Sequence, residues 1–107
     1  MRLLLYGGTF DPPHLGHMNN LRAAMDLVGP DRVIVMPAGI PPHKAASSTP
    51  AEQRLAMCAC FTALGPGVGV SRWEIDRGGR SYTVETLEML HRAYLGAELY
   101  LSVGSDM

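Results

Sequence analysis

Short apolar runs alternate with helically spaced apolar residues along this chain, and this alternation constrains its fold more than any other feature. The runs predict four strands, at residues 2–6, 32–37, 68–75 and 97–104. A helix is predicted between the first two strands, because apolar residues recur there at spacings of three and four: Leu15, Met18, Leu21, Met25 and Val28. Gly29 and Pro30 are expected to end this helix.

Two further helices are predicted between the later strands. The first should have Thr49 as its N-cap, Pro50 at its first helical position and Glu52 closing a capping box. It should end at Gly65 and Pro66, with an inward face of Leu55, Cys58, Phe61 and Thr62. The second is outlined by Val84, Leu87, Leu90, His91 and Tyr94.

Strands that alternate with helices in this order favour a parallel sheet with right-handed crossovers. We therefore expect a single α/β domain over residues 1–107. It should be a Rossmann-like parallel sheet of three βα units and a fourth strand, incomplete at its C-terminal side.

Charge and composition narrow the class of protein. The chain has 107 residues and a net charge of −1, so no basic surface for nucleic acid is indicated. Its beginning, "MRLLLY", has an uninterrupted apolar run of only four residues before Gly7, which is too short for a signal peptide or a membrane span. These features predict a soluble cytoplasmic protein with neither nucleic acid nor membrane as partner.

The two cysteines, Cys58 and Cys60, are two positions apart in a predicted helix. Side chains at that spacing point to different sides, so a mutual disulfide or a shared metal is not expected. Both are interpreted as reduced, mostly buried residues.

The unusual residues of this sequence fall in loops that follow the predicted strands. Ligands of parallel α/β sheets bind beyond the carboxyl ends of the strands. The loops concerned cover residues 7–17, 37–48, 76–83 and 104–107, and their convergence predicts one site.

The first of these loops belongs to the stretch "YGGTFDPPHLGH", residues 6–17. Gly7 and Gly8 allow close approach of the backbone to a ligand and positive φ angles. The helix that follows directs its free N–H groups at the sheet edge, as in phosphate sites. The GxGxxG and Walker A spacings are both absent, so neither a dinucleotide fingerprint nor a P-loop is indicated.

Two histidines complete this loop. His14 and His17 are three positions apart and share one side of the first helical turn, where they could donate hydrogen bonds to a phosphoryl group. Gly16 leaves out a side chain that could block access, and Pro12–Pro13 stiffen the loop.

Two other interpretations of this loop stay open from the residues alone. Asp11 could be an ordinary N-cap followed by Pro12 at the first helical position, with both histidines on the surface. Asp11, His14 and His17 could also bind zinc, although a clear fourth ligand is missing.

The run "GGTFDPPHLGH" resembles the signature of nucleotidyltransferases with an HxGH motif, and within them the nicotinate-nucleotide adenylyltransferases. The resemblance extends over the whole chain, because three later segments fit in order and spacing. It implies a catalytic role for His14 and His17 and a nucleotide bound along Gly7, Gly8, Thr9 and Phe10.

The second segment is "PAGIPPHK", a stiff loop that brings His43 and Lys44 to the edge of the site. Lys44 is a mobile charge suited to triphosphate oxygens, although taken alone it could be a solvated lysine. The resemblance implies that it contacts the phosphates of ATP.

The third segment, "GGRSYTVETLEML", places Ser81, Tyr82 and Thr83 at a helix N-terminus that could receive a carboxylate or phosphate. They could equally be a cap and a packing residue. The resemblance implies that they bind the nicotinate nucleotide. Arg72 and Arg80 could add positive charge nearby.

The fourth segment is "VGSDM". Gly104 would let a ligand lie against the strand end, and Asp106 could accept hydrogen bonds from ribose or a base, or be an ordinary polar residue. The resemblance implies that both help to hold the nucleotide.

The activity implied by the resemblance is transfer of AMP from ATP, with Mg²⁺, to nicotinate mononucleotide in NAD biosynthesis. Two alternatives are a related adenylyltransferase acting on nicotinamide mononucleotide or phosphopantetheine, and a nucleotide-binding module without turnover. The family continues well beyond the position of Met107. The chain is therefore expected to be the front portion of such an enzyme, with an exposed sheet edge that favours a homo-oligomer.

Overall fold

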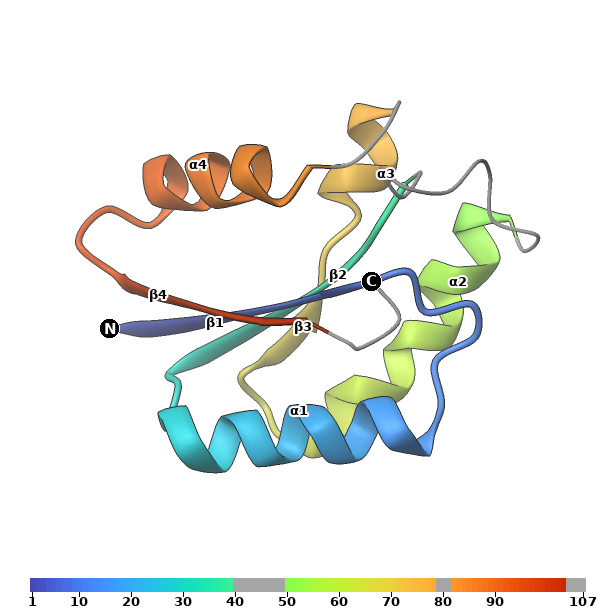
Figure 1. The fold of residues 1–107 in the computed structure, drawn as a ribbon, viewed down its shortest axis with the longest axis horizontal. Coiled ribbons are helices and arrows are strands. Elements are labelled where there is room, and N and C mark those ends of the chain that lie inside the picture. Colours follow the sequence, from blue (N-terminus) through green and yellow to red (C-terminus); the bar gives the residue numbers. More distant parts are fainter. Residues whose placement is uncertain (40–49, 79–81, 104–107) are drawn as a thin grey trace.

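Four parallel strands form one sheet in the computed structural model, which describes residues 1–39, 50–78 and 82–103 (Figure 1). The strands are β1 (Arg2–Gly8), β2 (Arg32–Pro37), β3 (Val68–Val70) and β4 (Glu98–Val103). They lie in the order β3-β2-β1-β4, and each neighbouring pair is parallel. The predicted α/β architecture is confirmed.

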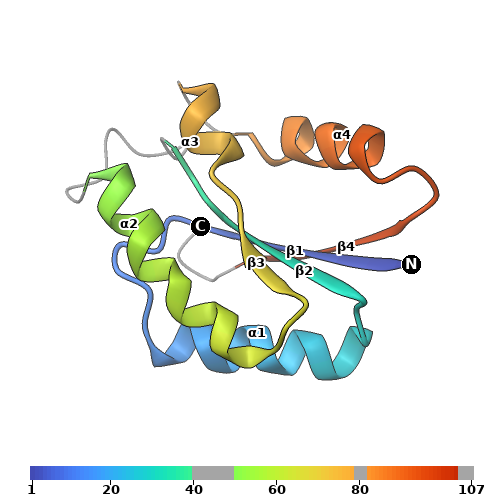
Figure 2. The same ribbon diagram turned by 180° about the vertical axis from the view of Figure 1, so that it is seen from behind.

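Helices cover both faces of the sheet (Figure 2). One face carries α1 (Leu15–Val28), α2 (Ala51–Met57) and the 3₁₀ helix η1 (Cys58–Leu64); the other carries α3 (Trp73–Arg77) and α4 (Thr83–Ala93). Among the described residues, no helix is both long and apolar enough to cross a membrane.

The core has two halves because successive strand residues point to opposite faces. One half gathers Leu4, Tyr6, Val33 and Val35 with residues of α1 and η1. The other gathers Leu3, Leu5, Ile34 and Met36 with Leu90 of α4. β2 is buried on both faces, as its β-branched run predicts.

The first helix has the predicted bounds, and the second differs from the prediction. Gly29 ends α1 with a φ of 62°, a left-handed conformation suited to glycine. α2 begins one residue later than predicted, with Pro50 as an N-cap that makes no side-chain bond. The predicted capping box is wrong, since the Glu52 carboxylate binds Arg72 instead; Thr49 lies outside the described residues. Thr62 is exposed rather than inward, and its hydroxyl donates to Ala59 O (2.7 Å).

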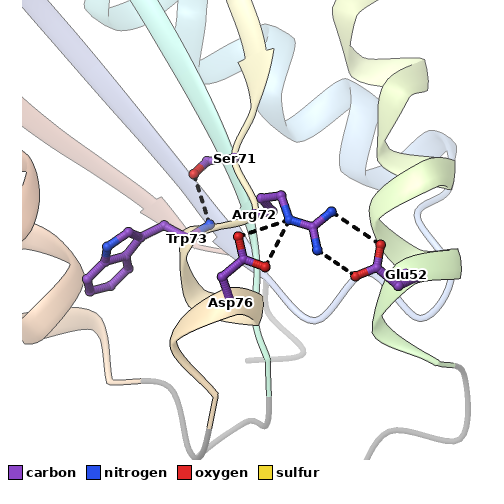
Figure 3. A network of polar contacts seen from close by, with 5 residues as sticks. All are labelled: Glu52, Ser71, Arg72, Trp73 and Asp76. Carbon is purple, nitrogen blue, oxygen red and sulfur yellow. Dashed lines mark hydrogen bonds and ion pairs between the residues drawn. The ribbon is translucent and has the colours of Figure 1, made fainter.

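The predicted strand over 68–75 is wrong beyond Val70, because Trp73–Arg77 is a helix. Local polar contacts favour this turn over an extended chain (Figure 3). Ser71 Oγ accepts the N–H of Trp73 at 3.2 Å, and Arg72 pairs with Asp76 one turn later at 2.9 Å. An apolar run of this length does not separate strand from helix when such contacts are available.

The two cysteines differ in exposure, so the prediction that both are mostly buried is wrong for Cys60. Burial raises the pKa of the Cys58 thiol to about 12. Because the thiolate is the reactive form, we expect only Cys60 to react quickly with a thiol reagent at about pH 8.

Thiol titration checks this expectation directly. The folded chain should consume one equivalent of reagent, and the chain unfolded in denaturant should consume two. The variant Cys60→Ser should show no fast labelling when folded. Rapid labelling of folded Cys60→Ser would contradict the buried placement of Cys58.

Candidate active site

The order of the strands reverses at β1. The segment that follows this strand and carries both histidines, residues 9–17, is called the histidine loop below. β2 and β3 lie on one side of β1 and β4 lies on the other. At its carboxyl end, Gly7 pairs with Met36 of β2 and with Val103 of β4. Such a switch point is where open parallel sheets bind their ligands.

The two glycines at this end are part of β1, which extends to Gly8. Among the described glycines, left-handed φ angles occur at Gly29, Gly78 and Gly96 and not at Gly7 or Gly8, so the prediction of positive φ for those two is wrong. Strand pairing on both sides of β1 holds them extended. The other predicted role of the two glycines is to let another group approach the backbone closely. The space around the backbone differs between Gly7 and Gly8.

At Gly8 a Cβ atom would lie 2.9–3.2 Å from the ring of Phe10, whereas at Gly7 nothing lies within 4 Å. We therefore expect Gly8→Ala to lower the free energy of unfolding by about 1–3 kcal/mol through overpacking. Gly7→Ala is the matched control and should change it by less than about 0.5 kcal/mol. Urea unfolding of both variants checks this, and equal stabilities would contradict the packing described for Gly8.

Phe10 makes the turn out of β1. Its φ is 52°, a left-handed conformation that is uncommon for a bulky residue. Its ring is buried and lies 5.4 Å from Tyr6, 5.3 Å from Phe61 and 5.1 Å from His17, centroid to centroid. The ring therefore supports the histidine from the core, which leaves the main chain of Phe10 as the part that could meet a ligand.

The N-cap of α1 is His14, so the interpretation with Asp11 as N-cap is wrong. The Nδ1 atom of His14 accepts the N–H of Gly16 at 3.0 Å. The Nδ1 atom of His17 accepts the N–H of His14 at 3.1 Å. The two imidazoles thus form a capping box, a role usually filled by hydroxyl and carboxyl side chains.

This hydrogen bonding fixes where each neutral ring carries its proton. A neutral imidazole that accepts at Nδ1 carries its hydrogen on Nε2. The rings of His14 and His17 stack with centroids 3.8 Å apart and planes 28° apart. His17 is buried and His14 is exposed, and the Tyr6 hydroxyl donates to the carbonyl of His17 at 3.1 Å. The predicted juxtaposition of the two histidines is confirmed, and each ring, when neutral, carries its hydrogen on Nε2.

Thr9 lies between the glycines and Phe10 and is only 4% exposed. Its hydroxyl is buried and has no hydrogen-bond partner within the described residues. Leaving a buried hydroxyl unpaired costs about 1–3 kcal/mol. Such a group at the carboxyl end of β1 is suited to bonding a ligand atom.

The sequence interpretation missed Arg54 of α2, whose side chain is almost completely buried. Its guanidinium donates to the carbonyls of Thr9 (2.8 Å), Ala38 (2.7 Å) and Gly39 (3.1 Å). Burial lowers the pKa of Arg54, and the nearby charge of Asp11 opposes that shift. Its spacing in the sequence does indicate that it is buried. Arg54 is four residues before Cys58 and seven before Phe61, so it lies on the same side of the helix as these two buried residues.

The remaining predicted residues are only partly described. Tyr82 is the exposed N-cap of α4, and Thr83 is half-buried at the first helical position. The Tyr82 side chain makes no cap hydrogen bond, and the interpretation with Ser81 as the cap falls on a residue outside the described parts of the chain. The other predicted residues lie outside the described parts of the chain: His43, Lys44, Arg80, Ser81, Gly104 and Asp106.

Arg72 is engaged with the carboxylates of Glu52 and Asp76 (Figure 3). Its guanidinium donates to both oxygens of Glu52, the closer at 2.7 Å, and to both oxygens of Asp76. These hydrogen bonds raise the pKa of Arg72. The network joins α2 to α3 at the carboxyl end of β3.

The zinc interpretation also finds no support. Over residues 1–39, 50–78 and 82–103, no three His, Cys, Asp or Glu side chains are grouped so that they could hold a metal ion. The Nδ1 atoms of both histidines are already bonded to backbone N–H groups.

The family model and the relatives that this chain matches agree with one another. Residues 5–107 match the family model described as cytidylyltransferase-like. A probable nicotinate-nucleotide adenylyltransferase of Corynebacterium kroppenstedtii is 47% identical over 106 residues, covering 98% of this chain and 50% of that protein. One from Gemmatimonas aurantiaca is 44% identical over 108 residues, covering 100% and 51%. The chain thus spans about half the length of the curated relatives it matches.

A solved structure agrees in fold. The nicotinic acid mononucleotide adenylyltransferase of Plasmodium falciparum, complexed with NaAD, matches with a TM-score of 0.81 and 19% sequence identity. The match covers 98% of this chain and 52% of that one. At this identity the likeness concerns the fold, and it supports the Rossmann-like description of the sheet.

Proposed function

Since the chain belongs to the cytidylyltransferase-like family, we propose that it transfers AMP from ATP to nicotinate mononucleotide, forming nicotinate adenine dinucleotide and pyrophosphate. The names of relatives at 44–47% identity support the choice of nicotinate nucleotide. The observation that carries the proposal is the stacked pair His14 and His17 at the start of α1, with each Nδ1 bonded to the backbone.

The chemistry requires positioning more than proton transfer. The acceptor is a phosphate monoester whose second pKa is about 6, so it is already ionised near neutral pH. Its oxygen attacks the α-phosphorus of ATP in line, and pyrophosphate leaves without a covalent enzyme intermediate. No general base is then needed, and the protein contributes orientation and charge stabilisation.

Both histidines and the four residues from Gly7 to Phe10 have roles in this proposal. The Nε2–H groups of His14 and His17 donate to oxygens of the α-phosphate as negative charge develops there. The N-terminus of α1 adds its positive dipole end. The nucleotide lies along Gly7, Gly8, Thr9 and Phe10, with the Thr9 hydroxyl as one donor.

Mg²⁺ enters this reaction with ATP as part of the substrate. Mg²⁺ in such sites keeps several waters and binds mainly through substrate phosphates rather than through a protein cage. Lys44 would neutralise the leaving pyrophosphate together with the ion.

The pyridine and ribose ends of the substrates complete the proposal. Ser81, Tyr82 and Thr83 would bind the nicotinate nucleotide at the start of α4, whose N-cap side chain makes no hydrogen bond to the first turn. Gly104 and Asp106 would hold the nucleotide at the end of β4. A cytoplasmic location is part of the same proposal.

The test is pyrophosphate release by the purified chain with ATP, Mg²⁺ and one acceptor at a time. We expect release with nicotinate mononucleotide and none without an acceptor. Turnover only with nicotinamide mononucleotide or only with phosphopantetheine would assign a different adenylyltransferase. ATP binding without release for any acceptor would contradict the proposed turnover and support a nucleotide-binding module.

A further inference from the structure

We propose that Arg54 is a positioning residue that holds the start of the histidine loop in place against Ala38 and Gly39, the two residues directly after β2. The inference rests on the proposed function, since its consequence for catalysis is a change in turnover. The residue touches no reacting group itself. It acts through the backbone of the two loops that leave the central strands.

Three backbone carbonyls among the described residues accept from the guanidinium, and they follow two different strands. Nη1 donates to the carbonyl of Thr9, which follows β1, and to the carbonyl of Ala38, which follows β2. Nη2 donates to the carbonyl of Gly39. A direct bond from the N–H of Ala38 to the carbonyl of Gly8, at 2.9 Å, already joins the two strand ends. Arg54 extends that connection past the ends of the strands.

Packing alone does not call for an arginine at this position. A buried cation is costly to desolvate, and apolar side chains often replace buried charges without loss of stability. A planar guanidinium, however, can bond several carbonyls in fixed directions, which a lysine ammonium cannot reproduce. We therefore infer that arginine at this position fixes the relative positions of the bonded carbonyls more than it adds to the stability of the fold.

The path from Arg54 to the histidines is short. Thr9, whose carbonyl accepts from Arg54, precedes Phe10, whose ring contacts the ring of His17 edge-on at 5.1 Å. His17 in turn stacks on His14. Without the guanidinium, the turn at Thr9 and Phe10 is no longer fixed to the backbone of Ala38 and Gly39. A shift of this turn would also move the His17 ring that Phe10 contacts and the His14 ring stacked on it.

We expect Arg54→Lys to lower kcat about 10²-fold while KM for ATP changes less than about threefold, because misplacement of catalytic groups by about 1 Å has effects of this size. Arg54→Met serves as a second variant with a neutral side chain of similar length. Leu90→Ala is the matched control, because Leu90 is equally buried but packs on the opposite face of the sheet. Its kcat should stay within about threefold of the starting protein when both variants are fully folded at the assay temperature.

A second measurement does not depend on turnover. Long-range ¹H–¹⁵N spectra report which nitrogen carries the proton in His14 and His17. In Arg54→Lys and Arg54→Met we expect these ring signals to shift or broaden, and in Leu90→Ala we expect them unchanged. Folded Arg54 variants with unaltered ring signals would overturn the inference.

The outcomes separate the inference from the proposed function. If the starting protein turns over and folded Arg54→Lys has the same kcat, the positioning role is wrong and the proposed function stands. If the starting protein does not turn over but the ring signals respond as expected, the proposed function fails and the positioning role stands. A parallel loss of kcat in Leu90→Ala would show that Arg54 acts through general stability, which also overturns the inference.

Discussion

His17→Asn is expected to lower kcat about 10²–10³-fold, the loss typical of removing one donor from a developing oxyanion. The Oδ1 atom of asparagine can still accept the N–H of His14, as Nδ1 of His17 does at 3.1 Å. The variant therefore keeps the capping interaction and removes the Nε2–H donor. Steady-state pyrophosphate release with saturating ATP and nicotinate mononucleotide measures the change.

The control for this substitution is His91→Asn, which changes an exposed histidine near the end of α4. It should leave kcat unchanged. Circular dichroism at the assay temperature shows whether His17→Asn is folded. A folded His17→Asn protein with kcat within about threefold of the starting protein would remove His17 from the catalytic machinery.

Gly16→Ala is expected to reduce kcat about 10²-fold with little change in the unfolding temperature. A Cβ atom at this position would lie 2.8 Å from Cε1 and 3.0 Å from Nδ1 of His14. The exposed His14 ring must then rotate away, which breaks its hydrogen bond to the Gly16 N–H and its stacking on His17. Loss of this N-cap bond costs about 0.5–2 kcal/mol, and the helix preference of alanine over glycine, about 1 kcal/mol, offsets it, so the stability of α1 should change little.

Thermal unfolding and pyrophosphate release, measured on the same preparation, separate the two effects. Leu27→Ala is the control, because it introduces alanine at an exposed position near the far end of the same helix. The sequence interpretation gave Gly16 the role of leaving access open, and the structure assigns it to the placement of His14. Full activity of Gly16→Ala would contradict that assignment.

The parts of the fold that were predicted correctly are those where one local signal dominates. The β-branched run of β2 is buried on both faces of the sheet, and the apolar spacing of α1 marks the face that it packs on the sheet. Gly29 ends α1 in the conformation that glycine favours. The histidine pair was predictable for a similar reason. Its spacing of three places both rings on one side of the first turn.

The parts that were missed depend on contacts between distant segments. Arg54 binds carbonyls 45 and 16 residues away, and nothing in its immediate neighbours reveals those acceptors. Gly7 and Gly8 could adopt positive φ, but pairing of β1 with β2 and β4 keeps them extended. The helix at Trp73–Arg77 replaced a predicted strand because the side chains of Ser71 and Asp76 stabilise a turn.

The central claim is that two neutral imidazoles, each held by its Nδ1 atom, present Nε2–H donors to the phosphates of ATP. Long-range ¹H–¹⁵N spectra of the starting protein, recorded as ATP and Mg²⁺ are added, test it most directly. We expect His14 and His17 both to carry their proton on Nε2 before ATP is added. Both Nε2 signals should then move as ATP binds, while those of His91 stay in place. A proton on Nδ1 of either ring, or Nε2 signals that ignore bound ATP, would contradict it.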